Sequence, residues 1–178
     1  MMTQEESASQ PSHQVPEKKQ TSLRLYLTAQ EAYDMWKADP KRVNILDVRT
    51  PEEYIFVGHP DMARNIPLLF VKYQLRPDKN EPAVEPNPDF VSTVKGLFAP
   101  TDTLLVMCRS GGRSALAVNQ LAKAGFVNIY NIIDGMEGDN VDDPGSVYHR
   151  KRMRNGWKNS GLPWTYDLSP QLCWLTDL

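Results

Sequence analysis

The sequence predicts an α/β domain in which helices cover both faces of a parallel sheet. Short apolar runs that can form buried strands alternate with amphipathic helical patterns, and the clearest runs span 43–49, 104–107 and 127–133. Parallel strands need a crossover connection, usually a helix, so this alternation is typical of a parallel α/β sheet. The order of the strands within the sheet cannot be read from the pattern.

Composition narrows the class of protein. The chain has 178 residues, of which 40% are hydrophobic and 24% charged, as in one soluble globular domain with some additions. Its net charge of −2 gives no general case for nucleic-acid binding. Two cysteines and three histidines form neither a disulfide framework nor a metal-ligand cluster, so we expect no metal and no cofactor.

The N-terminal sequence and the hydropathy of the chain predict its cellular compartment. No apolar run approaches the roughly 18 residues of a membrane span. The first residues lack the charged-then-apolar pattern of a signal peptide, so we expect a cytoplasmic protein without membrane contact. Residues 1–22 are rich in Gln, Ser, Pro, Glu and Lys and have almost nothing to bury, which predicts a disordered tail.

The first helix and the next strand have clear boundaries. Thr28 to Glu31 form a capping box that opens a helix, which ends at Asp39-Pro40. After the strand at 43–49, Thr50 to Glu53 form a second capping box with Pro51 at the first helical position.

Two charged residues stand at the end of the 43–49 strand. Asp47 and Arg49 would project at the carboxyl edge of the sheet, beside the loop that contains Cys108. They either fix the turn by hydrogen bonds or take part in the chemistry directly.

The middle of the chain is interrupted by glycine and proline. His59 lies in a turn and is interpreted as a structural residue, not as a general base. Five prolines between 67 and 88 predict that 70–88 is an irregular excursion. Asn87-Pro88-Asp89 then caps a helix that Pro100 closes.

Cys108 is the strongest candidate for chemistry. It ends the apolar run 104–107, and Gly111 and Gly112 allow the backbone to curl so that amide groups face one point before a helix begins. The partial positive charge there favours a thiolate, and Arg109 and Arg113 add full charges. A buried, inert cysteine is the alternative. The setting instead predicts a nucleophilic sulfur in an anion-binding cradle.

The last part of the chain has a different character. After the strand at 127–133, acidic residues at 134–139 are placed to rim the site. Residues 141–178 form an extension that we expect to pack on the domain through Trp157, Trp164 and Trp174. Its basic run at 148–154 is interpreted as a solvated surface, and Cys173 as a bystander.

Three motifs follow one another along the chain, namely Leu46-Asp-Val-Arg-Thr-Pro-Glu-Glu-Tyr54, Gly58-His59 through Ala63-Arg-Asn-Ile-Pro67, and Cys108-Arg-Ser-Gly-Gly-Arg-Ser-Ala115. Together they resemble the single-domain rhodanese family of sulfurtransferases. The resemblance covers about 23–140. It implies a three-layer fold with a central parallel five-stranded sheet flanked by helices. The sequence departs from the usual pattern at Pro60-Asp-Met62, in the excursion at 70–88 and in the extension.

The resemblance also implies a reaction. Cys108 would take the outer sulfur of thiosulfate or of a persulfide donor, become a persulfide, and pass the sulfur to cyanide, a thiol or a protein acceptor. Asp47 and Arg49 would support the site. The substrate would be bound by the loop residues, namely Arg109, Ser110, Gly111, Gly112, Arg113 and Ser114.

Two other functions stay open at this point. A cysteine-dependent phosphatase or arsenate reductase also places a thiolate in an amide-lined loop closed by arginine. Those phosphatases need Cys-x5-Arg, whereas Arg113 gives Cys-x4-Arg here, a loop sized for a sulfur atom. The third interpretation is a non-enzymatic persulfide carrier or docking module.

Overall fold

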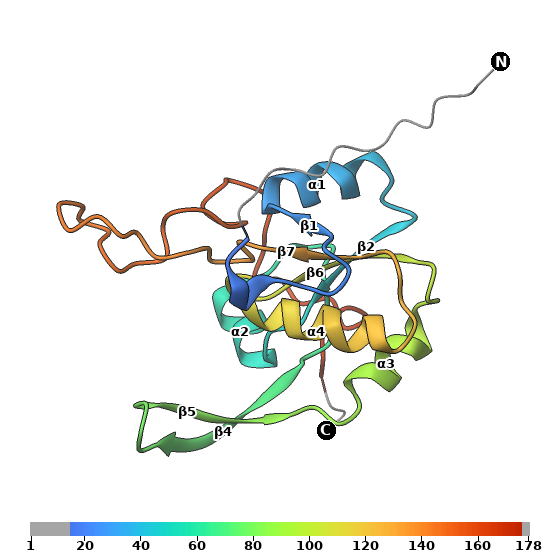
Figure 1. The fold of residues 1–178 in the computed structure, drawn as a ribbon, viewed down its shortest axis with the longest axis horizontal. Coiled ribbons are helices and arrows are strands. Elements are labelled where there is room, and N and C mark those ends of the chain that lie inside the picture. The colour runs from blue at the N-terminus through green and yellow to red at the C-terminus, as the bar shows by residue number, and fades with distance from the viewer. Residues whose placement is uncertain (1–14, 176–178) are drawn as a thin grey trace.

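The computed structural model describes residues 15–175. Its centre is a parallel sheet with strands in the order β1, β7, β6, β2, β3 (Figure 1). The strands are β1 (Tyr26–Leu27), β2 (Val43–Asp47), β3 (Arg64–Asn65), β6 (Thr103–Met107) and β7 (Ile129–Ile132). The expected α/β class with five parallel strands is confirmed. The strand that precedes Cys108 lies in the middle of this sheet.

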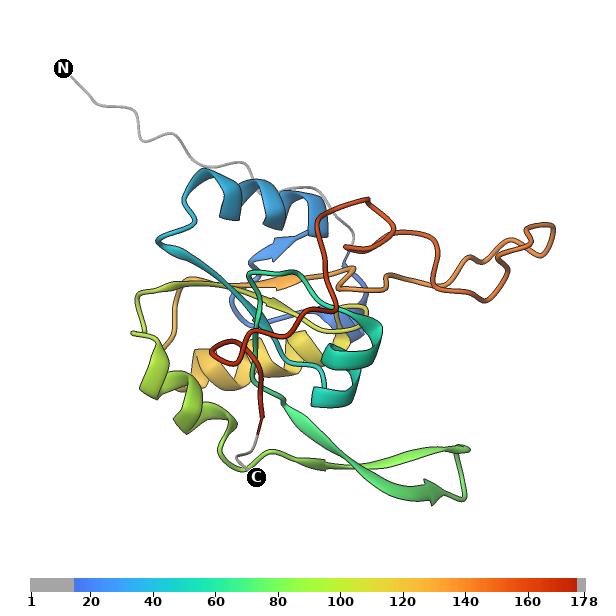
Figure 2. The ribbon, with the colours of Figure 1, turned by 180° about the vertical axis from the view of Figure 1, so that it is seen from behind.

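Helices cover both faces of the sheet, because strand side chains alternate between the two faces. On one face, Leu105 and Met107 pack in the core cluster that includes residues of α1 (Ala29–Ala38). On the other face, Leu104 and Val106 pack with residues of α3 (Phe90–Leu97) and α4 (Gly112–Lys123). Figure 1 shows α1 and α4 on opposite sides of the strands, and Figure 2 shows the same layers from behind.

Both predicted capping boxes are confirmed. Thr28 caps α1 and Thr50 caps α2 (Pro51–Val57), and each threonine side chain accepts a hydrogen bond from the backbone N–H three residues later. In α2 the return bond runs from the Thr50 N–H to the carboxylate of Glu53, at 3.1 Å. Since β2 feeds directly into this cap, Glu53 is fixed at the carboxyl edge of the sheet.

The N-terminal segment differs from the prediction. Residues 1–14 of the expected tail lie outside the described residues, but the expectation of disorder is wrong for 15–22. There η1 (Glu17–Lys19) is a single 3-10 turn, and the side chain of Lys19 pairs with Asp139 at 2.8 Å. The Lys19 carbonyl also accepts a hydrogen bond from Asn131 at 2.9 Å. These partners are more than 100 residues away in sequence, so local composition could not indicate them.

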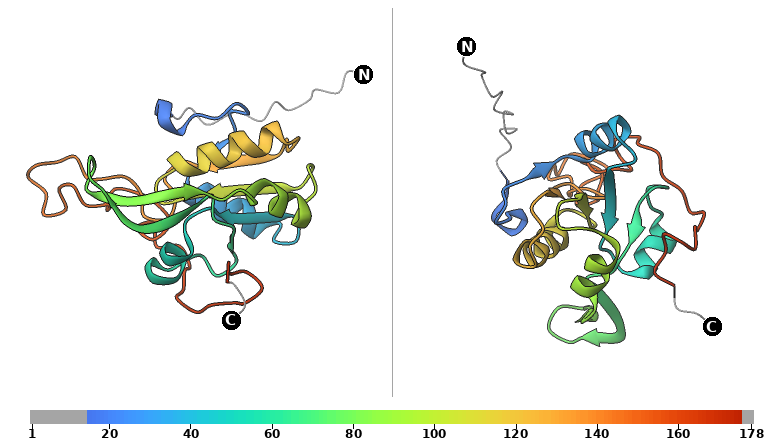
Figure 3. Two further views of the ribbon diagram at one scale, coloured as in Figure 1. Left: turned by 90° about the horizontal axis from the view of Figure 1, so that it is seen from below. Right: turned by 90° about the vertical axis from the view of Figure 1, so that its right-hand side faces the viewer.

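Residues 70–88 are not the irregular excursion that their prolines indicated. They hold an antiparallel hairpin of β4 (Leu69–Arg76) and β5 (Glu81–Pro86), which projects from the body of the molecule (Figure 3). Each strand of a two-stranded hairpin has one unpaired edge, where a proline without an N–H is tolerated. Pro82 and Pro86 are therefore compatible with β5.

The C-terminal extension returns along the body of the domain. Trp157 is fully buried in the core on the α1 side, and Trp174 packs against the core on the α4 side. His59 and Thr165 exchange two backbone hydrogen bonds of 3.0 and 2.8 Å. The Leu172 carbonyl accepts from the N–H of Asn65 in β3, so the extension covers the outer edge of that strand.

Two segments leave the body on the same side. They are the loop that begins the extension, drawn in orange, and the β4–β5 hairpin (Figure 3). Within residues 15–175, no helix combines the length and the apolar composition needed to cross a membrane.

Candidate functional site

Cys108 lies where β6 ends at the carboxyl edge of the sheet, and the residue is 2% exposed. The N–H of Gly111 donates a hydrogen bond to Sγ at 3.2 Å. Gly111 has φ +95°, and a Cβ at this position would collide with the carbonyl of Ile133. Only glycine meets both requirements without strain, so this residue lets the loop curl around the sulfur.

A buried chain of polar groups leads to the other side of the sulfur. The hydroxyl of Ser114 lies 3.4 Å from Sγ and 2.6 Å from the Oδ1 of Asn131. The amide of Asn131 donates to the carbonyls of Lys19 and Gly111, at 2.9 and 3.1 Å. Those two bonds fix which atom of Asn131 faces Ser114.

The single hydroxyl proton of Ser114 can serve one acceptor at a time. When the sulfur is a neutral thiol, the Ser114 hydroxyl can donate its hydrogen bond to the Asn131 oxygen. When the sulfur is an anion, the hydroxyl can rotate and donate to Sγ. The arrangement therefore holds a donor ready for negative charge on Cys108.

Arg113 was expected to hold an anionic substrate, but its guanidinium is occupied by a protein carboxylate. It donates two hydrogen bonds of 2.6 Å to Glu53 on α2. Burial by itself would raise the pKa of Glu53, but the hydrogen bonds and charge of Arg113 outweigh it and lower that pKa. Arg113 thus ties α4 to α2 beside Cys108, and its charge is largely neutralised.

Asp47 and Arg49 form an ion pair with both side chains completely buried. Arg49 Nη2 lies 2.6 Å from the Asp47 carboxylate and 2.8 Å from the carbonyl of Gly58. Burial would lower the pKa of Arg49, and the charge of Asp47 outweighs this and raises it. None of the hydrogen bonds of either side chain across residues 15–175 reaches Cys108. Of the two roles left open, the geometry favours fixing the turn.

His59 is buried and structural, as interpreted from the sequence. Its Nδ1 lies 3.0 Å from the carbonyl of Tyr54, and its ring stacks on the Tyr54 ring with centroids 3.6 Å apart. Cys173 is partly buried and forms no disulfide. Burial raises the pKa of its thiol. Among the described residues, no cluster of three or more His, Cys, Asp or Glu side chains could hold a metal ion.

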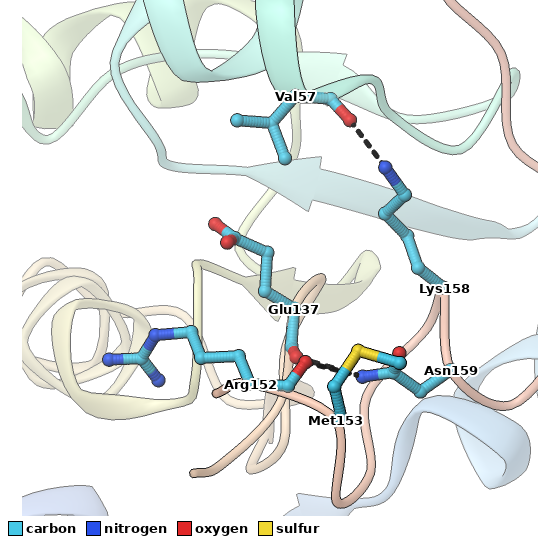
Figure 4. A pocket seen from close by; sticks show the side chains of 6 residues that line it. All are labelled: Val57, Glu137, Arg152, Met153, Lys158 and Asn159. Carbon is cyan, nitrogen blue, oxygen red and sulfur yellow. Dashed lines mark hydrogen bonds between the residues drawn. The ribbon is translucent and has the colours of Figure 1, made fainter. Parts of the chain in front are cut away.

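The rim of the site carries several cations. Arg109 is exposed, and Ser110 and Gly112 are partly exposed. A cavity of about 180 Å³ opens next to the loop and is lined by Val57, Glu137, Arg152, Met153, Lys158 and Asn159 (Figure 4). One backbone hydrogen bond joins its wall to the loop, because the N–H of Glu137 donates to the carbonyl of Arg109 at 2.9 Å. The N–H of the preceding Met136 donates to the carbonyl of Cys108 at 2.8 Å.

The acidic residues at 134–139 have different roles in the structure. Asp134 is buried and accepts from the N–H groups of Ala29 and Gly156. Burial raises its pKa. Asp139 is paired with Lys19, and only Glu137 lines the cavity. The expected acidic rim is therefore a single carboxylate.

Three residues near Cys108 were missed by sequence reasoning. Asn131 could have been found as the one polar side chain in the buried strand Ile129–Ile132. Glu53 was read only as part of a capping box, although its carboxylate also pairs with Arg113. Arg152 belongs to the basic run interpreted as a solvated surface, but its side chain lines the cavity.

Sequence comparisons place the chain among known proteins. The model of the rhodanese-like domain matches residues 28–140. An uncharacterized protein of Rickettsia rickettsii is 33% identical over 136 residues, which cover 76% of this chain and 93% of that protein. Thiosulfate sulfurtransferase 16 of Arabidopsis thaliana is 38% identical over 90 residues, which cover 51% of this chain and 68% of that protein.

Solved structures agree with the sequence comparisons. The crystal structure of Rv0390 from M. tuberculosis superposes with a TM-score of 0.61 at 27% identity, covering 79% of this chain and 96% of that one. The polysulfide-sulfur transferase homodimer from Wolinella succinogenes has a TM-score of 0.50 at 21% identity, covering 83% and 81%, and shares the fold. Together with the Cys108 loop and the parallel sheet, these matches establish that the chain belongs to the rhodanese-like domain family.

Proposed function

We propose that this protein is a sulfurtransferase that carries a sulfane sulfur on Cys108. The observation that carries the proposal is the environment of the sulfur. The Gly111 N–H and the Ser114 hydroxyl lie 3.2 and 3.4 Å from Sγ at the carboxyl end of a central parallel strand. Both groups can stabilise a thiolate and, after transfer, a persulfide anion.

The reaction has two displacement steps. In the first, the Cys108 thiolate attacks the outer sulfur of thiosulfate, a new S–S bond forms, and sulfite leaves with the electron pair of the broken S–S bond. In the second, cyanide or a thiolate attacks the terminal sulfur of the persulfide. The Cys108 thiolate is then the leaving group, which restores the starting state.

The loop supports sulfur over phosphate chemistry. Phosphatases close their loop with an arginine that faces a tetrahedral phosphate, but here Arg113 is bound to Glu53 through both of its terminal nitrogens. The loop from Cys108 to Arg113 is also one residue shorter than the phosphatase loop. A single sulfur atom needs less room than a phosphate group.

The test is the mass of the intact protein after incubation with thiosulfate. We expect one added sulfur atom on the wild type and on C173S, the matched control at the second cysteine. We expect none on C108S. Addition of cyanide should remove the sulfur and produce thiocyanate.

Other outcomes separate the alternatives. Sulfur transfer that survives in C108S would overturn the mechanism. Hydrolysis of a phosphate ester without any sulfur adduct would favour a phosphatase. A stable adduct that neither cyanide nor thiols discharge would favour a persulfide carrier.

A further inference from the structure

The C-terminal extension places Arg152 beside the loop of the candidate site. The Nη1 of Arg152 donates to the carbonyl of Gly138 at 2.7 Å, and the N–H of the same Gly138 donates to the carbonyl of Arg109 at 3.2 Å. One residue therefore links the guanidinium of Arg152 to the backbone of Arg109. Arg152 is outside residues 28–140, the part that matches the rhodanese-like domain.

The side-chain amide of Asn159 binds the backbone carbonyl of Arg152. The Nδ2 of Asn159 lies within 3.0 Å of the carbonyls of Glu137, Arg152 and Asn155. This contact joins the cavity wall to the extension, and Figure 4 shows Arg152 directed away from Lys158. The Asn159 amide therefore connects the backbone of Arg152 to that of Glu137 and Asn155.

Two arginines at this rim form no ion pair within the described part of the chain, although Glu137 lines the same cavity as Arg152. Neither Arg109 nor Arg152 forms a side-chain ion pair with any residue in 15–175. The carboxylates of Asp47, Glu53 and Asp139 are already paired with other cations.

The positive charges of Arg109 and Arg152 also repel one another. Burial lowers the pKa of Arg152, and the charge of Arg109 lowers it further. The charges of Glu137, Asp139 and Cys108 act on the pKa of Arg152 in the opposite direction. Because the two guanidinium charges repel one another and neither has an ion-pair partner within 15–175, an anion bound beside both would be stabilised.

We propose that Arg152 and Arg109 together bind the anionic end of the sulfur donor, and that the extension thereby makes the site selective for small anions over neutral molecules. This inference rests on the proposed function. In a donor such as thiosulfate, the three oxygens would face the two guanidinium groups and the outer sulfur would face Cys108. Arg152 is then a specificity-determining residue supplied by a segment outside the family domain.

The experiment compares two alkylating reagents at Cys108 in the absence of any sulfur donor. Iodoacetate is an anion and iodoacetamide is its neutral counterpart, and both form the same type of thioether with a thiolate while iodide leaves. Peptide mass spectrometry separates the reaction of Cys108 from that of Cys173. The rate constant for iodoacetate divided by that for iodoacetamide measures the preference of the site around Cys108 for an anion.

We expect R152Q to lower this ratio by about fivefold, as for loss of one charge close to the sulfur. R152K keeps the charge and should keep most of the ratio, which separates charge from any loosening of the extension. The matched control is R154Q, because Arg154 is an exposed arginine two residues away. We expect the control to leave the ratio unchanged, and added salt to reduce the ratio of the wild type.

The same variants are then loaded with thiosulfate. We expect R152Q to need about tenfold more thiosulfate for half-maximal loading, whereas R154Q needs the wild-type concentration. An unchanged alkylation ratio in R152Q would overturn the inference, even if sulfur transfer is intact. A lowered ratio without any sulfur loading in the wild type would keep the anion site and overturn the proposed function instead.

Discussion

Arg113 on α4 donates two hydrogen bonds of 2.6 Å to the two carboxylate oxygens of Glu53 on α2. Both side chains are mostly buried, with 23% and 22% of their surfaces exposed. Glu53 also accepts the N–H of Thr50 and so completes the cap of α2. One carboxylate therefore connects the start of α2 to the helix that follows the Cys108 loop.

Replacing Glu53 should destabilise the protein. In E53Q the amide keeps the shape of the side chain, but the guanidinium of Arg113 loses its charged partner in a mostly buried place. We expect the free energy of unfolding to fall by about 2 kcal/mol, below the loss for a fully buried pair because this one is partly exposed. Urea denaturation measures the change.

The control is E85Q, because the pair of Glu85 with Lys72 is about half exposed on the hairpin. Its loss should cost under about 1 kcal/mol. If E53Q and E85Q lose the same free energy of unfolding, the pair of Arg113 with Glu53 does not contribute more to stability than an exposed pair.

The same ion pair predicts part of the acid sensitivity. Arg113 lowers the pKa of Glu53 below its ordinary value of 4.5. The unfolded chain therefore binds the proton more tightly than the folded protein. The contribution of Glu53 is present above the unfolded pKa and is lost as the pH falls through the lower folded pKa.

Urea denaturation at about pH 7 and at about pH 3.5 tests this sign. Because E53Q has already lost the titrating group, we expect it to lose less stability on acidification than the wild type does. A wild type and an E53Q variant with parallel pH profiles would show that this carboxylate does not contribute.

Ser114 should contribute to the rate of sulfur loading. S114A removes the hydroxyl that lies 3.4 Å from Sγ and leaves the Gly111 N–H as the remaining donor to the sulfur. We expect loading with thiosulfate to slow roughly tenfold, the value of a hydrogen bond to a charged group. The loading reaction is quenched at successive times, and the mass of the intact protein at each time gives the rate of loading.

S92A is the matched control, because Ser92 is an exposed helical serine whose hydroxyl bonds to its own turn. It should load at the wild-type rate. If S114A also loads at that rate, the hydroxyl has no part in stabilising the sulfur anion.

Substitution of Arg49 tests whether this residue has a structural or a catalytic role. R49Q leaves the carboxylate of Asp47 buried without its counter-ion, so we expect a loss of about 3–5 kcal/mol in unfolding free energy. R42Q is the control, because Arg42 pairs with Asp39 only at 3.8 Å on the surface. It should change stability by less than about 0.5 kcal/mol.

The second measurement on R49Q is the alkylation of Cys108 by iodoacetamide at a temperature where the variant remains folded. We expect a rate within about twofold of the wild type, because no hydrogen bond of Arg49 reaches the sulfur. A much slower reaction in the folded variant would assign Arg49 to the chemistry.

Local signals were sufficient for two helix starts and for the strand, loop and helix around Cys108. Thr28 and Thr50 marked two helix starts through capping boxes, because a capping box is completed within four residues. The apolar run before Cys108 and the glycines after it identified the strand, the loop and the helix for the same reason. Strand order was not predicted, since it depends on pairing between distant segments.

The charge pattern of the site could not be predicted from local signals. Arg113 follows Cys108 by only five residues in the chain, but its role depends on Glu53, 60 residues earlier. Arg152 reaches the rim only because residues 141–175 fold back over the domain. The hairpin at 69–86 was missed because prolines argue against strands unless the free edge of each strand is known.

Glycine substitutions provide the last test of the loop. Gly111 needs φ +95°, and a Cβ there would meet the Ile133 backbone, so G111A should both strain the loop and shift the N–H that bonds to Sγ. We expect a loss of more than about 1 kcal/mol in stability. G96A is the control, because Gly96 lies inside α3 with open space around it and should gain about 0.5–1 kcal/mol. Thermal denaturation and the rate of thiosulfate loading measure the two effects. A G111A protein that loads as fast as G96A would show that the Gly111 amide is not needed to hold the sulfur.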